Sequence, residues 1–279
     1  MLKRLSAVGG AGLVLALAGY AFDSTITGTA GAKPTAHAAA SGSSGMSVMT
    51  GAKIKILSPT PGQVITGNQV NLDVAITHFK VDCRYAGTAN RMGIGHYHVM
   101  LDGGLINMFC GPKATISLAN VSAGKHTLEV LAAANDHASD MHSAKMVAFT
   151  YKPTTPLTIA PHPFSGSPSI SIVSPKPGAT VSGGFNLVVH VANFIPSCAL
   201  YGKPNLAGYG HWHAFVDTLN GGMMGMGTML FMSCAHSGYV SLAGIKPGKH
   251  TFYAELVDNL HTTSIKGPHV AASVTVTVK

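Results

Sequence analysis

Charged side chains are scarce in this chain: they make up 10% of its 279 residues, and only ten of them are acidic. This composition argues against long helices held together by rows of ion pairs. Aromatic residues are also few, at 7%, and the chain has no stripe of basic residues interleaved with aromatics. We therefore expect no nucleic-acid partner. The net charge of +8 supports at most a weak association with an anionic cell envelope.

Recognisable catalytic motifs are missing as well. The sequence has no Gly-x-Ser-x-Gly nucleophile turn, no phosphate-binding glycine loop and no closely paired carboxylates. No segment after residue 22 is apolar for long enough to cross a membrane. We expect a protein that is not an enzyme, while redox chemistry at a bound copper ion stays open as a weaker alternative.

The N-terminus has the features of an export signal. Lys3 and Arg4 precede an apolar run from Leu5 to Phe22, and Ala36-His37-Ala38 offers a cleavage site with small residues. We predict a signal peptide over 1–38, with an uncleaved N-terminal anchor as the alternative. A Ser- and Gly-rich linker follows over 39–52. The protein is thus expected to be secreted or held in the cell envelope.

The chain after residue 52 is rich in small and apolar residues and contains an internal repeat. The motif Ile-x-Ile-x-Ser-Pro-x-Pro-Gly occurs at Ile54–Gly62 and again at Ile170–Gly178. Between the two copies lies a stretch rich in Pro, Thr and Ser. We predict β-sandwich domains over 53–152 and 169–279, joined by a Pro-rich linker over 153–168.

Cysteine and histidine positions recur with the repeat. The first cysteine precedes the first histidine of a His-x-His pair by 13 residues in both halves, from 83 to 96 and from 198 to 211. Four cysteines in an exported chain favour disulfides, and the repeat selects Cys83–Cys110 and Cys198–Cys234. The interval from the His pair to the second cysteine is nine residues longer in the second half.

Short runs of strand-forming residues with turn signals between them predict an all-β fold of two tandem immunoglobulin-like antiparallel sandwiches. The expected strands of the two halves correspond one to one. They are Val70–Ile76, His96–Leu101, Thr115–Leu118, His126–Ala132 and Lys145–Tyr151, and then Phe185–Val191, His211–Val216, Tyr239–Leu242, His250–Val257 and Ala272–Val278.

The His-x-His pairs carry the strongest chemical signal. Side chains of a strand alternate between its two faces, so His96 and His98 point the same way, with Asp102 four residues further on. Tyr97 and its apolar neighbours take the other face, which we assign to the core. The histidine face is then expected to be open to solvent, a groove or a partner. His211, His213 and Asp217 repeat this pattern.

Each half holds two further histidines. His126 and His250 open a long strand, and His137 and His261 follow its far end. A straight strand of ten residues spans about 33 Å, so both cannot reach one ion. We favour the later histidine, because the loop after a strand can fold over its neighbour.

Neutral imidazole is a good ligand for Cu(II) and Zn(II), so each half predicts a divalent-metal site, with copper or zinc as the ion. Asp102 and Asp217 would ligate the metal or orient an imidazole. The alternative is a polar strand face whose histidines bind no metal. The insertion adds methionines suited to Cu(I), or to packing, namely Met223, Met224, Met226, Met229 and Met232.

Two family resemblances accompany these motifs. The Ile-x-Ile-x-Ser-Pro-x-Pro-Gly text, with the Val-x-x-Gly at Val64–Gly67, resembles the first strand of many bacterial immunoglobulin-like domains. Gly-His-x-His-x-x-x-Asp, followed by Gly-Lys-His-Thr and a terminal His, resembles a bacterial exported domain family of unknown function. The His-x-His on a sandwich strand is also similar to that of copper/zinc superoxide dismutases.

Two functions follow as hypotheses. The first is an exported, non-enzymatic protein with one copper or zinc ion in each half. The second is a cell-surface structural or adhesion module that binds a protein or polysaccharide without metal. The sequence leaves the oligomeric state open.

Overall fold

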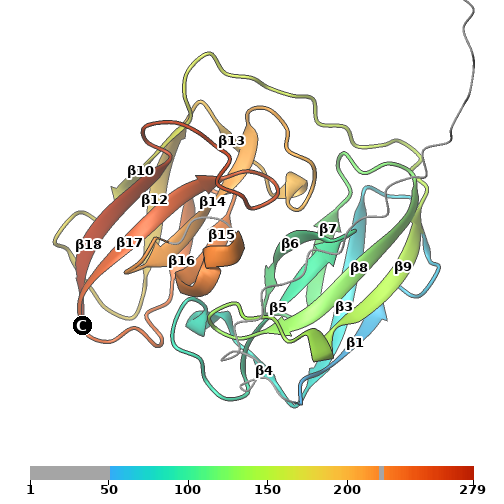
Figure 1. Ribbon diagram of the computed structural model, residues 1–279, viewed down its shortest axis with the longest axis horizontal. Coiled ribbons are helices and arrows are strands. Elements are labelled where there is room, and N and C mark those ends of the chain that lie inside the picture. Colours follow the sequence, from blue (N-terminus) through green and yellow to red (C-terminus); the bar gives the residue numbers. More distant parts are fainter. Residues whose placement is uncertain (1–50, 220–222) are drawn as a thin grey trace, which may run out of the picture. The chain divides into compact units, whose positions relative to one another are not determined.

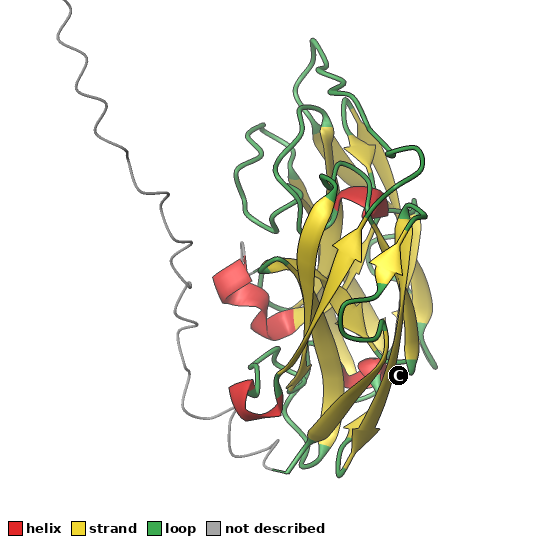
Figure 2. Cartoon of the chain, turned by 90° about the vertical axis from the view of Figure 1, so that its right-hand side faces the viewer, coloured by secondary structure: helices red, strands yellow, loops and turns green. Residues whose placement is uncertain are grey.

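The computed structural model describes residues 51–219 and 223–279 of the chain. The predicted signal peptide at 1–38, and the predicted linker up to residue 50, lie outside these residues. The described residues fold as β-strands joined by loops and short 3-10 turns, which Figure 2 shows in yellow, green and red. Within them, no helix is long and apolar enough to span a membrane.

The first half forms a sandwich of a three-stranded sheet, in the order β1-β3-β7, against a sheet in the order β2-β9-β8-β5-β4 with β6 also paired to β5 (Figure 1). Its strands are β1 Lys53–Ser58, β2 Val64–Ile65, β3 Gln69–Thr77, β4 Lys80–Val81, β5 Ile94–Leu101, β6 Gly104–Phe109, β7 Lys113–Ser117, β8 Gly124–Ala133 and β9 Lys145–Tyr151.

The second half has the same plan, with β10-β12-β16 against β11-β18-β17-β14-β13 and β15 paired to β14. Its strands are β10 Ser169–Ser174, β11 Thr180–Val181, β12 Phe185–Ala192, β13 Ile195–Pro196, β14 Tyr209–Val216, β15 Met229–Ser233, β16 Ser237–Val240, β17 Gly248–Val257 and β18 Ala271–Val278. The all-β prediction of two tandem immunoglobulin-like sandwiches is confirmed. The long strands pair antiparallel, and only short two-residue strands pair parallel.

Each sandwich has its own apolar core, built from the face of the His-x-His strand that lacks histidine. Tyr97 and Val99 are fully buried in the first core, and Trp212 and Ala214 are fully buried in the second. The prediction of the core face is therefore correct. Two disulfides close the sandwiches as predicted, Cys83–Cys110 and Cys198–Cys234, with Cα atoms 5.7 and 5.4 Å apart.

The strands not expected from the sequence are the two-residue strands β2, β4, β11 and β13 and the longer strands β6 and β15. The signal for β6 is an Asp-Gly dipeptide, because Asp102 and Gly103 both have positive φ, as a two-residue type I′ hairpin turn requires. Leu101 pairs directly with Gly104 across this turn. In the second half the insertion separates β14 from β15 and includes the 3-10 turn η5, Met223–Thr228, which obscures the same hairpin.

The two sandwiches also contact each other, and both belong to one compact unit. A third group of buried apolar residues, here called the interface cluster, draws on β6 of the first sandwich and β15 of the second. Its members are Ala86, Leu105, Met108, Phe215, Met226, Met229 and Met232. Met226, Met229 and Met232 of the insertion thus pack between the sandwiches, while the side chains of Met223 and Met224 lie outside the described residues.

Candidate metal centre

Three histidines converge in each sandwich. His96 and His98 project from β5, and His137 comes from the loop after β8. In the second sandwich His211 and His213 project from β14, and His261 comes from the loop after β17. Within each trio, one ring nitrogen per residue lies within 4.8 Å of the other two. We call these the first and second triads.

The second triad is the tighter of the two. Nε2 of His211 lies 2.9 Å from Nε2 of His213 and 2.9 Å from Nδ1 of His261, and Nε2 of His213 lies 3.3 Å from that Nδ1. Two imidazole nitrogens about 2.0–2.1 Å from one tetrahedral ion would be about 3.3 Å apart. The three nitrogens are therefore spaced nearly as ligands of a single small cation.

The first triad has the same layout. Nε2 of His96 lies 3.0 Å from Nε2 of His98. The ring of His137 is centred 4.6 Å from that of His96 and 5.8 Å from that of His98, and it stacks on the latter. Positive φ angles of 65° at His137 and 61° at His261 turn both loops back over the neighbouring strand.

A backbone carbonyl of the other sandwich orients the third histidine of each triad. Nε2 of His137 donates to the carbonyl oxygen of Met229 at 2.7 Å, and Nε2 of His261 donates to that of Leu105 at 2.6 Å. A carbonyl oxygen only accepts, so Nε2 carries the proton and Nδ1 keeps its lone pair. That lone pair faces the triad, as in many metal-ligating histidines.

Burial keeps all six rings in the neutral form that binds metal. Loss of solvent lowers the pKa of His98 to about 3 and the pKa values of His137 and His261 to about 4. The pKa values of His96, His211 and His213 also fall well below the ordinary value, again mainly through burial.

The triads are also electrostatic neighbours. Charge on His261 of the second triad lowers the pKa of His98 in the first, and charge on His137 lowers the pKa of His213. The histidine face was expected to meet solvent, a groove or a partner, and the first of these is wrong. His96, His211 and His213 are fully buried, and the other sandwich supplies part of the cover. The sequence pattern identified the face but contained no signal that the two faces meet.

Four predicted site residues lie elsewhere. His126 Nδ1 is 2.6 Å from Asp102 Oδ2, and its Nε2 is 2.9 Å from the carbonyl oxygen of Ser122. His250 makes the same contacts, with Asp217 Oδ2 at 2.7 Å and the carbonyl oxygen of Lys246 at 2.8 Å. These pairs tie the turn after β5 or β14 to the start of β8 or β17. They do not join the triads, because His126 lies near the Leu101 end of β5, whereas His96 pairs with Ala133 at the other end of the strand pair.

The surroundings of the two triads differ. Leu131 on β8 pairs with His98 in the first sandwich, whereas Glu255 on β17 pairs with His213 in the second. Burial raises the pKa of Glu255, and its Oε2 has no hydrogen-bond partner among the described residues. Tyr201 lies edge-on to His211, with ring centroids 4.4 Å apart. The second triad thus has an acidic and a phenolic neighbour, and the counterpart of Glu255 beside the first triad is the apolar Leu131.

Comparison with known proteins adds little to this geometry. No protein-family model matches the chain, and no curated protein matches it. Among solved structures, the chain is similar to the fibronectin(III)-like modules of Clostridium thermocellum CbhA, at 14% identity and a TM-score of 0.26, covering 81% of this chain and 94% of that one. The four N-terminal Ig domains of Dscam1 isoform 6.9 match at 11% identity and a TM-score of 0.21, covering 82% of this chain and 47% of that one.

These neighbours are β-sandwich modules and say nothing about function. The resemblance to an exported domain family of unknown function rests on its motifs alone and stays a prediction.

Proposed function

We propose that this protein binds transition-metal ions, one in each histidine triad, and that the ion is copper or zinc. The single observation that carries the proposal is the convergence of three buried, neutral imidazoles at equivalent places in both sandwiches. Nitrogens only 2.9–3.3 Å apart in the second triad cannot all be satisfied by hydrogen bonds to one another. A cation would accept all three lone pairs at once.

The hydrogen bonds from His137 and His261 to backbone carbonyls support the same function. Each third histidine has its proton held by a backbone carbonyl, so its other nitrogen is presented as a fixed donor. Such fixing reduces the entropy that binding costs. Nothing in the triads resembles a nucleophile with a base beside it, so the proposal is a binding protein rather than a hydrolase. The paired cysteines are consistent with an oxidising compartment outside the cytoplasm.

The test is metal content after loading the full chain with Cu(II) or Zn(II) and removing excess ion. We expect two ions per chain, and one after His96→Ala with His98→Ala. The matched control replaces two exposed histidines, His190→Ala with His236→Ala, and should keep both ions. Wild-type protein that retains no stoichiometric metal overturns the proposal.

The second candidate is a structural or adhesion module, which the tandem immunoglobulin-like fold favours. In that case the triads are polar contacts between the sandwiches, and metal has no effect on stability. An ion bound only by the folded state stabilises it by about 2.7 kcal/mol at a free concentration one hundred times its Kd. Thermal unfolding with copper, with zinc and with chelator therefore separates the two functions.

A further inference from the structure

Two methionines stand at equivalent positions beside the triads. Met108 on β6 pairs directly with His98 on β5, and Met232 on β15 pairs directly with His213 on β14. Cross-strand partners lie on the same face of a sheet, with Cβ atoms about 4.5–5.5 Å apart. Tyr97 and Phe109, the adjacent pair, stack at 5.8 Å in the core. Met108 and His98 therefore share the opposite face, where the triad lies.

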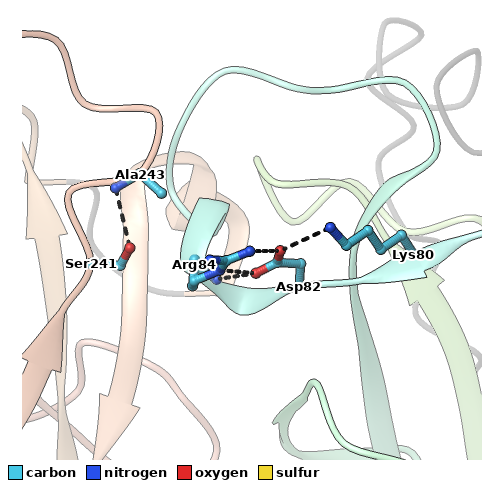
Figure 3. Close-up of polar contacts among 5 residues, drawn as sticks. All are labelled: Lys80, Asp82, Arg84, Ser241 and Ala243. Carbon is cyan, nitrogen blue, oxygen red and sulfur yellow. Dashed lines mark hydrogen bonds and ion pairs between the residues drawn. The ribbon is translucent and has the colours of Figure 1, made fainter.

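Both methionines also line one cavity. It has a volume of about 300 Å³ and is bounded by residues of both sandwiches, among them Cys83, Arg84, Phe231 and Tyr239. Figure 3 shows two residues of its lining, Arg84 on one sandwich and Ser241 on the other. Asp82 accepts hydrogen bonds from Arg84 at 2.9 and 2.7 Å and so partly offsets its charge (Figure 3).

This cavity lies beside the triads, because two residues of its lining are the strand partners of His98 and His213. The histidines of the triads are at most 7% exposed, so an ion must enter through a gap between side chains. Met108 and Met232 are each 8% exposed, and they link the cavity to the histidine beside each of them. The described lining includes both methionines and none of the triad histidines, so an ion that entered here would meet the methionines first.

A thioether donor beside the imidazoles would favour some metal ions over others. Thioether sulfur is a soft donor that suits Cu(I), whereas Zn(II) in proteins takes imidazole, thiolate and carboxylate. The alternative explanation is that methionine fills an irregular interface between the sandwiches. Against it, the remaining paired positions of β6 and β15 differ: Phe109 corresponds to Ser233, Asn107 to Phe231 and Leu105 to Met229, while Met108 and Met232 agree.

We propose that Met108 and Met232 are thioether ligands that make copper, held as Cu(I), the preferred ion of the two triads. This inference rests on the proposed function, because it adds one donor and a metal preference to the same sites. Each site would then offer three imidazole nitrogens and one sulfur, delivered from the cavity between the sandwiches.

The first measurement needs no variant. X-ray absorption at the copper edge of the wild-type protein, loaded anaerobically with Cu(I), should show sulfur as well as nitrogen in the coordination shell. Neither disulfide is expected to contribute this signal, and reduction of the disulfides is checked by thiol titration. A shell of nitrogen alone overturns the inference.

The second measurement compares affinities. Met108→Leu with Met232→Leu preserves volume, and we expect about a tenfold weaker Cu(I) affinity in competition with a chromophoric Cu(I) chelator. Zn(II) affinity should change less than about threefold. The matched control is Met226→Leu, a buried methionine of the same interface cluster that lies in the 3-10 turn η5 rather than on a strand opposite a histidine.

The outcomes separate the two proposals. Wild-type protein that takes up neither copper nor zinc overturns the proposed function and this inference together. Two bound ions with equal Cu(I) affinity in the double variant and in Met226→Leu overturn the methionine ligands alone. Equal losses of Cu(I) and Zn(II) affinity in the double variant also overturn them, because packing would then explain the effect.

Discussion

His137 of the first sandwich donates its Nε2 proton to the carbonyl oxygen of Met229 in the second, across 2.7 Å. The reciprocal bond runs from His261 to the carbonyl oxygen of Leu105. Leu105 and Met229 occupy equivalent places, opposite Met100 on β5 and Phe215 on β14. Each triad is thus completed by a histidine whose orientation depends on the other sandwich, and metal binding should depend on how closely the sandwiches pack.

Moving the two sandwiches apart should weaken metal binding at the second triad. A Cβ added at Gly104 would clash with the carbonyl oxygen of Gly202, at the point where Leu105 accepts the bond from His261. We expect Gly104→Ala to lower metal affinity at the second triad by about 10–100-fold, as happens elsewhere when a ligating histidine loses the hydrogen-bond partner that orients it. Isothermal titration of the metal-free full chain measures this change.

The control for that variant is Gly67→Ala, since a Cβ at Gly67 meets nothing within 4 Å. It should bind metal as the wild type does. If Gly104→Ala also keeps both affinities, the inter-sandwich hydrogen bonds do not orient the ligands.

The His126–Asp102 pair is expected to stabilise the fold without touching the metal. His126 is 9% exposed, and both of its ring nitrogens have partners, Asp102 and the carbonyl of Ser122. His126→Ala should therefore lower the free energy of unfolding by about 1–3 kcal/mol. Metal content should stay at the wild-type value, whereas His98→Ala should remove one ion. Loss of an ion in His126→Ala would return this histidine to the list of ligands.

The sequence could predict much of this arrangement because the relevant patterns are local. Alternation along β5 and β14 identified the core face, and equal spacing in the two halves paired the cysteines. The length of a strand showed that His126 and His137 could not share one ion, and the loop after the strand favoured His137 and His261. The structure brings those two to the His-x-His pairs.

Other features could not be predicted because they depend on contacts between the two sandwiches, which the spacing of residues does not reveal. They are the burial of the triads and the hydrogen bonds to the carbonyls of Leu105 and Met229. Strand β6 was missed for a different reason: the apolar run from Leu105 to Phe109 does not alternate, and only the Asp102-Gly103 turn marks it. The placement of Asp102 beside His126 follows from that same turn.

Acid should destabilise the metal-free protein. The pKa of His98 is about 3 and those of His137 and His261 are about 4 in the fold, below the ordinary value near 6.5. As pH falls from 6.5 to 4, the unfolded chain binds protons at these residues and the folded chain does not. The unfolding free energy therefore falls, by up to about 1.4 kcal/mol per pH unit for each such histidine.

Denaturant unfolding in the presence of chelator at pH 7.5, 6 and 5 measures this slope. His98→Leu with His137→Leu removes two of the titrating groups and should flatten it. A wild-type slope that the double variant reproduces would place the acid sensitivity elsewhere in the chain.

Glu255 offers a prediction of the opposite sign, because replacing it should make the metal-free protein more stable. The chain has only two glutamates, and this one is 8% exposed, with Oε2 lacking a hydrogen-bond partner among the described residues. Burying a polar group without a partner costs about 1–3 kcal/mol on mutational scales. The equivalent position in the first sandwich is Leu131, which is 2% exposed. Glu255→Leu should therefore raise the free energy of unfolding by about 1–3 kcal/mol in chelator.

Glu129→Leu, at a more exposed place on β8, is the matched control and should change the free energy of unfolding little. A loss of stability in Glu255→Leu would mean that the carboxyl group makes a favourable interaction at the second triad, and retention of both metal ions in that variant would exclude a role for it as a ligand.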